Sequence, residues 1–320
     1  MRAVVLSGPG PVENLAVAEL PVPQPPPGWV RVRVRAFGLN RSELHTRLGL
    51  AEGVTFPRVP GIEAVGVVDS DCDLPVGRQV AAMMGGMGRV FDGGYAEYVV
   101  VPREVLIPFD SDLPWEVLGA VPETLQTAYG SLTTGLDLRA GQSLLIRGGT
   151  SALGFAATAL ARDLGATVLA TTRRPERLDV LREHGVAHPL VDDGAVAGRV
   201  RELFPDGVDA ALELVGTATL PDTLAATRVH GTVCFTGMLS DQWLVRDFYP
   251  IGYLPKGVRL TAYHGESADL PAEVLQRFLD RVAGGAVTLG PTAVYRLDEI
   301  RQAHDDLEHG RRVGKLVGIV

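Results

Sequence analysis

Three hydrophobic patterns divide the chain. Short valine-rich runs separated by proline and glycine turns fill roughly the first hundred residues, a pattern typical of β-strands, with examples at residues 30–35, 64–68 and 96–101. In residues 30–35 valine alternates with arginine, so one face of the expected strand is apolar and the other is charged. The N-terminal region is therefore predicted to be β-rich.

From about residue 116 strand-like and helix-like patterns alternate. The expected strands are 143–147, 167–172, 187–191, 208–214 and 231–236, and the expected helices are 152–164, 175–184, 194–204 and 218–227. Such alternation predicts a parallel sheet with helices on both faces, which residues 258–263 would extend at its edge.

The C-terminal tail has a third pattern. It predicts a helix at 271–283, a strand at 293–296, a helix at 297–308 and a strand at 315–320. We expect the tail to pack with the N-terminal β region, so that residues 1–117 and 264–320 form one domain and residues 118–263 are inserted as another.

Composition narrows the class of protein. The 320 residues are 46% hydrophobic and 21% charged, as in soluble globular proteins, and the net charge of −8 argues against nucleic acid or an anionic membrane as a partner. Two distant cysteines form neither a disulfide framework nor a metal quartet. The apolar N-terminal run is too short for a signal peptide, and the longest apolar stretch is about half a membrane span. We expect a cytoplasmic protein without a membrane partner.

A glycine turn follows the predicted strand 143–147. Gly149, Ser151 and Gly154 lie in the spacing G-x-S-x-x-G, with serine where a dinucleotide fingerprint has its middle glycine. A strand, a glycine turn and a helix in this order direct free backbone N–H groups at a pyrophosphate. We expect Gly149, Ser151, Ala152 and Leu153 to contact it, although an ordinary βα turn would have the same pattern.

The end of the next strand bears on the choice of nicotinamide cofactor. It ends in Thr172-Arg173-Arg174, and no carboxylate follows until Glu176. An acidic residue here would suit the ribose hydroxyls of NAD, whereas two guanidinium groups and a hydroxyl suit the 2′-phosphate of NADP. Thr172, Arg173 and Arg174 therefore favour NADP(H). The alternative is two solvated arginines at a helix start, where cations oppose the helix dipole.

Several short segments in fixed order resemble the medium-chain dehydrogenase/reductase superfamily, in particular the zinc-independent quinone oxidoreductases related to ζ-crystallin. They are the glycine turn and residues 38–45, 60–68, 93–98 and 127–130. The resemblance implies a GroES-like β-rich catalytic domain built from both ends of the chain. It also implies a Rossmann domain, a doubly wound parallel sheet that binds NADP, and often a homodimer.

The chain departs from zinc-dependent members of that superfamily. Asn40 and Ile62 stand where those enzymes have cysteine and histidine ligands, the third ligand falls near Glu123, and residues 83–88 replace the four-cysteine lobe. Because catalytic zinc needs three protein ligands, we expect no metal, and we expect Glu63 and Glu123 to be hydrogen-bonded groups. Without zinc, hydride from NADPH suits an already electron-poor small molecule, a quinone or α,β-unsaturated carbonyl. An enoyl-thioester reductase and a non-catalytic NADPH-binding protein are the alternatives.

The resemblance also suggests roles for individual residues. Asn40 would contact the substrate oxygen or the nicotinamide ribose, or else is only a turn-forming asparagine, while Ser42 and His45 would relay a proton. His45 has the alternative of a surface histidine on a loop. The remaining cofactor contacts expected by position are Arg41 at the pyrophosphate, Thr127 near the nicotinamide, Gly237 and Met238 at its carboxamide, and Lys315 at a phosphate.

Overall fold

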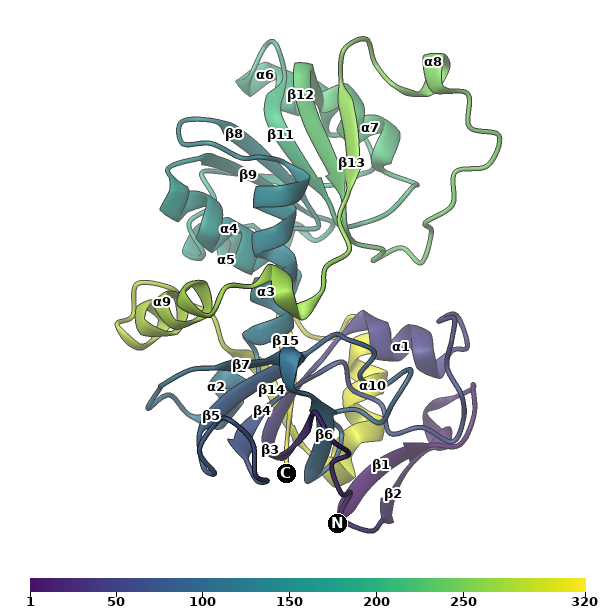
Figure 1. The fold of residues 1–320 in the computed structure, drawn as a ribbon. Helices are drawn as coiled ribbons and strands as arrows, with labels where there is room; N and C mark the ends of the chain where they lie inside the picture. The colour runs from purple at the N-terminus through teal and green to yellow at the C-terminus, as the bar shows by residue number, and fades with distance from the viewer. The chain divides into compact units, whose positions relative to one another are not determined.

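The computed structural model describes residues 1–320 and divides them into two compact units (Figure 1). The first unit comprises residues 1–126 and 265–320, and the second comprises residues 127–264. The sequence-based boundary at 117/118 precedes helix α3 (Pro122–Gly130), whereas the boundary in the structure lies within that helix. The second boundary, expected at 263/264, lies at 264/265.

The first unit is built on a seven-stranded sheet with the order β14-β15-β3-β4-β5-β7, in which β6 also pairs with β3. Its strands are β3 (Trp29–Leu39), β4 (Glu63–Val68), β5 (Gln79–Met83), β6 (Tyr98–Pro102), β7 (Leu106–Pro108), β14 (Pro291–Arg296) and β15 (Lys315–Ile319). The alternation in residues 30–35 gives the strand one apolar and one charged face, as predicted. The three valines are buried, whereas the arginines lie on the opposite face, with Arg31 half-buried and the other two exposed.

The two ends of the chain meet in this sheet. Strand β15 from the tail pairs antiparallel with β3 from the N-terminal region, so the predicted packing of the tail on the β region is confirmed. A separate hairpin-like pair is formed by β1 (Arg2–Leu6) and β2 (Leu15–Glu19). The helices of the unit are α1 (Arg41–Arg47), α2 (Trp115–Leu118), α9 (Ala272–Ala283) and α10 (Ile300–Glu308), and α1 packs on α10.

The second unit contains the six-stranded sheet predicted from the alternating pattern. Its order is β10-β9-β8-β11-β12-β13 and every neighbouring pair is parallel. The strands are β8 (Ser143–Arg147), β9 (Thr167–Thr172), β10 (His188–Val191), β11 (Val208–Glu213), β12 (Thr227–Phe235) and β13 (Arg259–Ala262). Because the strand order reverses at β8 and β11, this is a doubly wound sheet with a switch point between those strands.

Helices cover both faces of this sheet. They are α4 (Ala152–Leu164), α5 (Leu178–Glu183), α6 (Ala197–Leu203) and α7 (Leu220–Ala226). Since parallel crossovers are right-handed, α4 and α5 lie on one face and α6 and α7 on the other. The apolar side chains of α6 and α7 form one buried cluster with residues of β8, β9, β11 and β12.

Three expected helices begin three residues later than the sequence pattern suggested. Residues 175–177 form a 3-10 turn before α5, in which the N–H groups of Arg177 and Leu178 donate to the carbonyls of Arg174 and Pro175. Residues 297–299 form a similar turn before α10. Helix α6 begins at Ala197 rather than 194, because Gly194 has a φ of +97° within a loop.

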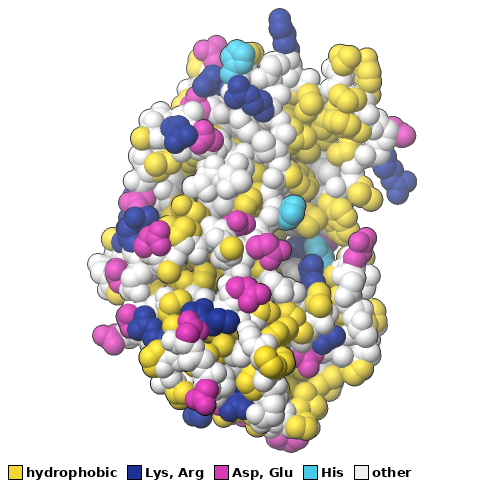
Figure 2. Space-filling model, in the orientation of Figure 1, with side chains coloured by type: hydrophobic (Ala, Val, Ile, Leu, Met, Phe, Trp, Pro, Cys, Tyr) yellow, Lys and Arg dark blue, Asp and Glu magenta, His cyan; other side chains and the backbone are white.

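The segment between β12 and β13 exposes unusually many apolar side chains. It includes the short helix α8 (Pro250–Tyr253), and Figure 2 shows hydrophobic side chains gathered over this part of the unit. The exposed ones are Leu239, Leu244, Phe248, Tyr249 and Ile251. No helix of the chain has the length and apolar character needed to cross a bilayer.

Candidate active site

The glycine turn between β8 and α4 has the close packing that a dinucleotide cradle requires. A Cβ added to Gly149 would lie 2.6 Å from the Cβ of Ala170, and one added to Gly154 would lie 2.5 Å from the carbonyl oxygen of Gly149. Ser151 caps the helix, because its hydroxyl accepts the N–H of Gly154 at 3.0 Å and donates to the carbonyl of Gly148 at 2.8 Å. Only glycine fits at positions 149 and 154.

The backbone N–H groups of this turn divide into two sets. Those of Gly149 and Ser151 donate to the carbonyls of Thr171 and Gly148, so these two residues shape the turn. Those of Ala152 and Leu153 belong to the first turn of the 13-residue helix α4 and have no acceptor in the chain. Of the four residues predicted to contact a pyrophosphate, Ala152 and Leu153 therefore have donors to offer an anion.

A cluster of arginines follows β9. Arg173 and Arg174 are exposed, half-buried Arg177 lies close to them, and none of the three forms an ion pair. Partial burial and the neighbouring charges of Arg174 and Arg173 lower the pKa of Arg177. Thr172, in contrast, is buried and its hydroxyl accepts the N–H of Arg174 at 3.3 Å. The nearby carboxylate of Glu176 offsets part of this positive charge, but none of the three arginines is held in an ion pair, and such a cluster suits an anion.

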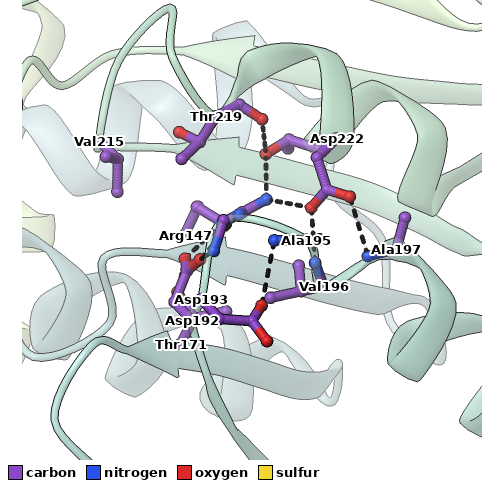
Figure 3. Close-up of polar contacts among 12 residues, drawn as sticks. Arg147, Thr171, Asp192, Asp193, Ala195, Val196, Ala197, Val215, Thr219 and Asp222 are labelled. Atoms are coloured by element: carbon purple, nitrogen blue, oxygen red, sulfur yellow. Dashed lines mark hydrogen bonds and ion pairs between the residues drawn. The ribbon is translucent and has the colours of Figure 1, made fainter.

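A buried ionic network lies at the carboxyl end of the same sheet (Figure 3). Arg147, the last residue of β8, is fully buried and contacts Asp192 through two nitrogens, Nε at 2.5 Å and Nη2 at 2.8 Å. Its Nη1 donates to Asp222 on α7 at 2.6 Å. Asp222 in turn accepts the N–H groups of Val196 and Ala197 and so caps α6.

Glu213 is a further buried acid at this edge. It ends β11 and accepts hydrogen bonds from the N–H groups of Val215 and Gly216 and from the hydroxyls of Thr219 and Thr223. Burial nevertheless raises its pKa. These bonds fix the loop after β11. Gly237, which is predicted to contact the nicotinamide carboxamide, lies next to this loop.

Gly237 itself is required by close backbone packing. A Cβ there would lie 2.6 Å from the Cα of Leu214, and its N–H donates to the carbonyl of Glu213 at 3.1 Å. Met238 follows it half-buried, and Thr127 lies half-buried on α3. All three belong to the second unit, and their contacts with a cofactor stay predictions.

In the first unit a lysine is buried among oxygen atoms. Lys315 Nζ donates to Asn40 Oδ1 at 2.5 Å and lies 2.7 Å from Glu63 Oε1 and 3.4 Å from Glu123 Oε2. The amide of Asn40 donates to Glu63 Oε1 at 3.0 Å. Burial lowers the pKa of Lys315, but the charges of Glu63 and Glu123 outweigh it and the pKa is raised. The lysine is therefore a charged ammonium group.

A second acid supports this polar cluster. Glu43 on α1 is buried and accepts the N–H groups of Asn40 and Ile62, each at 2.8 Å. Burial raises its pKa from 4.5 to about 7. Gly38 makes room for the cluster, because a Cβ there would lie 2.0 Å from Glu63 Oε1.

The two residues predicted to relay a proton lie on α1. Ser42 is half-buried and its hydroxyl accepts Nη2 of Arg89 at 2.7 Å. His45 is 8% exposed, so the alternative of a surface histidine on a loop is wrong. Arg41 is the first residue of α1, lies in the first unit and is half-buried. Its contact with the pyrophosphate stays a prediction.

The structure corrects the expectation for Lys315. Its side chain is 3% exposed and its ammonium is paired with two carboxylates, so it is not available to a phosphate. The carboxylates of Glu63 and Glu123 accept hydrogen bonds, as expected. Sequence reasoning missed the functional candidates Arg147, Arg177 and Glu43. A charged residue ending an apolar strand was the available signal for Arg147.

Comparisons with known proteins agree with this geometry. Residues 26–111 match the alcohol dehydrogenase GroES-like domain, and residues 152–280 match the zinc-binding dehydrogenase family. The chain is 27% identical to a quinone oxidoreductase from Sus scrofa, covering 96% of this chain and 94% of the relative. It is 32% identical, over 98% of its length, to the spectinabilin polyketide synthase system protein NorB from Streptomyces orinoci, of which it spans only 14%.

Solved structures give the same result. A mycobacterial protein determined in complex with NADPH matches with a TM-score of 0.87 and 26% identity, covering 100% of both chains. A doubly wound sheet with a glycine cradle, joined to a GroES-like domain, defines a nicotinamide-dependent oxidoreductase. The chain belongs to the medium-chain dehydrogenase/reductase superfamily and is quinone oxidoreductase-like.

The residues present do not fit the zinc ion that the second family name implies. The Lys315 ammonium already lies between the oxygens of Asn40 and Glu63, and a protonated amine cannot coordinate a metal. The side chain of Ile62 offers no donor atom. No three histidine, cysteine, aspartate or glutamate side chains of the chain are grouped so as to hold a metal ion. A lysine provides the positive charge of this cluster.

Proposed function

We propose that the chain transfers hydride from NADPH to an electron-poor small molecule, a quinone or an α,β-unsaturated carbonyl. The observation that carries the proposal is the cluster of three unpaired arginines at the end of β9, beside a glycine cradle in a nicotinamide-dependent fold. NADPH, when bound, supplies the hydride and becomes NADP⁺.

The second unit would hold the cofactor by its anionic groups. The free N–H groups of Ala152 and Leu153 suit the pyrophosphate, and Arg173, Arg174 and Arg177 suit the 2′-phosphate. No carboxylate side chain stands at the end of β9 to select the ribose hydroxyls of NAD. These features together favour NADPH over NADH.

In the first unit Asn40 is suited to bind the acceptor oxygen. One hydrogen of its amide is bound to Glu63, which leaves the second hydrogen for a substrate. The Lys315 ammonium donates to the amide oxygen and so polarises the amide, because hydrogen bonds in series strengthen one another. A polarised N–H stabilises the negative charge that reaches the acceptor oxygen when hydride adds to carbon.

The proton that completes the reduction would come through α1. His45 and Ser42 lie three positions apart and so share one face of that helix. Since Arg89 already donates to the Ser42 hydroxyl oxygen, the serine proton is left to be donated. His45 carries the imidazole of α1, a side chain type that serves as a general acid in many enzymes.

The same arrangement explains why the acceptor must be activated. Catalytic zinc lowers the pKa of a bound water by about 9 units, which corresponds to roughly 12 kcal/mol of stabilisation of the oxygen anion. The amide of Asn40 supplies only a small part of this stabilisation, because the Lys315 ammonium that polarises it is itself paired with two carboxylates. Quinones and enones need only modest stabilisation of the developing charge.

Cofactor titration tests the phosphate assignment. Dissociation constants for NADPH and NADH are measured by nicotinamide fluorescence for the wild type, Arg174→Ala and Arg177→Ala. Each variant should weaken NADPH binding about 10- to 100-fold, the value of one charged hydrogen bond, and leave NADH unchanged. Arg182→Ala is the matched control, because this α5 arginine is paired with Asp179. Equal affinities of the wild type for NADPH and NADH would refute the assignment.

A second candidate activity is reduction of an enoyl thioester. It is favoured by the similarity to the polyketide synthase system protein, which covers nearly all of this chain. Turnover of NADPH with matched free enones and enoyl-CoA esters distinguishes the two activities. A kcat/KM at least about tenfold higher for the thioester would favour this second activity.

A further inference from the structure

Asp192 is an acid in a position that should oppose NADPH binding. It follows β10 directly, and its backbone N–H donates to the carbonyl of Thr172 at 2.7 Å. Thr172 immediately precedes the arginine cluster proposed to bind the 2′-phosphate. A free carboxylate at this end of the sheet would repel the phosphate and accept the ribose hydroxyls of NADH instead.

The structure turns this carboxylate away from solvent. The side chain of Asp192 is 6% exposed, and both of its oxygens contact the guanidinium of Arg147 (Figure 3). Further hydrogen bonds come from the hydroxyl of Thr171 at 3.0 Å and the N–H of Gly194 at 2.9 Å. The pair of parallel contacts fixes the direction of the carboxylate, and the guanidinium, which Asp222 shares, screens its charge.

The same network reaches the glycine turn. Thr171, which donates to Asp192, accepts the backbone N–H of Gly148 at 3.1 Å. Arg147 precedes Gly148 in the chain, so its side chain connects the turn with the loop after β10. The network thus joins the two places at which the phosphates of NADPH are proposed to bind.

We propose that Arg147 is a positioning residue for cofactor specificity: it holds the Asp192 carboxylate inward, screens its charge, and so permits a 2′-phosphate at the arginine cluster. This inference rests on the proposed function, because it presupposes NADPH as the cofactor. Arg147 itself is fully buried, so it would act through Asp192.

The test compares Arg147→Gln, Asp192→Asn and the double variant. The measured quantity is the ratio of the NADH and NADPH dissociation constants, together with the affinity for 2′,5′-ADP, which carries the 2′-phosphate. Arg147→Gln should reduce the NADPH preference about tenfold by exposing an unbalanced charge near the phosphate. Adding Asp192→Asn should restore the ratio to within about threefold of the wild type, since it removes that charge.

Asp222→Asn is the matched control. This variant removes the negative charge of the other carboxylate that is paired with Arg147, but it leaves the two contacts between Arg147 and Asp192. The ratio of the NADH and NADPH dissociation constants should therefore not change. If Arg147→Gln does not fold, Arg147→Lys takes its place, because lysine keeps the charge but cannot make two parallel contacts. A smaller loss of NADPH preference is then expected, because the direction of the carboxylate is released while the positive charge stays, and Asp192→Asn should again restore the ratio.

Two results separate the inference from the function on which it rests. A wild type that does not prefer NADPH overturns the proposed function and this inference with it. A wild type that prefers NADPH, with variants that weaken NADPH and NADH equally or are not restored by Asp192→Asn, overturns the role of Arg147 alone.

Discussion

Glu43 should make the stability of the first unit depend on pH. Burial raises its pKa from 4.5 to about 7, so the folded chain binds a proton that the unfolded chain has already released in this range. The contribution to stability is fully present below pH 4.5 and is lost as the pH rises through 7. At one pKa unit for each 1.36 kcal/mol, the loss amounts to about 3 kcal/mol.

Urea unfolding of the wild type and Glu43→Gln between pH 5 and 8 measures this contribution. In a Trp243→Phe background, fluorescence follows Trp29 and Trp115, both in the first unit. The free energy of unfolding of the variant minus that of the wild type should increase by about 2.5 kcal/mol over this range, because glutamine does not titrate. Glu273→Gln, at an exposed position on α9, is the control. A difference for Glu43→Gln that is constant with pH would refute the reasoning.

Three further predictions concern stability and assembly. Lys315→Met should lower the free energy of unfolding by about 3–5 kcal/mol, because it leaves buried carboxylates without a cation, whereas Lys256→Met at an exposed position should have little effect. Gly149→Ala should destabilise the second unit by about 1–3 kcal/mol and weaken NADPH binding, whereas Gly198→Ala, with no atom within 4 Å, should be neutral or stabilising in thermal unfolding. We expect a homodimer that covers the apolar segment between β12 and β13, so Ile251→Asp, at a residue 83% exposed, should convert a dimer to a monomer in light scattering. A monomeric wild type would contradict the last prediction.

The sequence predicted the second unit well, because its signals are local. Strand β8, helix α4 and strand β9 have the expected bounds, since apolar runs, an N-cap serine and the glycine turn lie within thirty residues of one another. The short strands β5 and β7 of the first unit were not anticipated. Their pairing depends on partners elsewhere in the sheet rather than on a pattern of their own.

The candidate site was less accessible to sequence reasoning, because its contacts join distant positions. Arg147 pairs with residues 45 and 75 positions further along the chain, and Lys315 binds Asn40 across 275 positions. A lysine near the C-terminus gives no sign of whether it faces a phosphate or is buried against carboxylates. Ala152 and Leu153 were predictable because a helix N-terminus always leaves N–H groups without intrahelical acceptors.

NADPH consumption measured against a panel of quinones, enones and simple ketones, with NADH in parallel, tests the proposed function most directly. We predict acceleration by quinones or enones, a preference for NADPH, and no measurable oxidation of a simple alkanol with NADP⁺. Binding of NADPH without acceleration by any electron-poor acceptor would contradict the account, as would brisk oxidation of the alkanol.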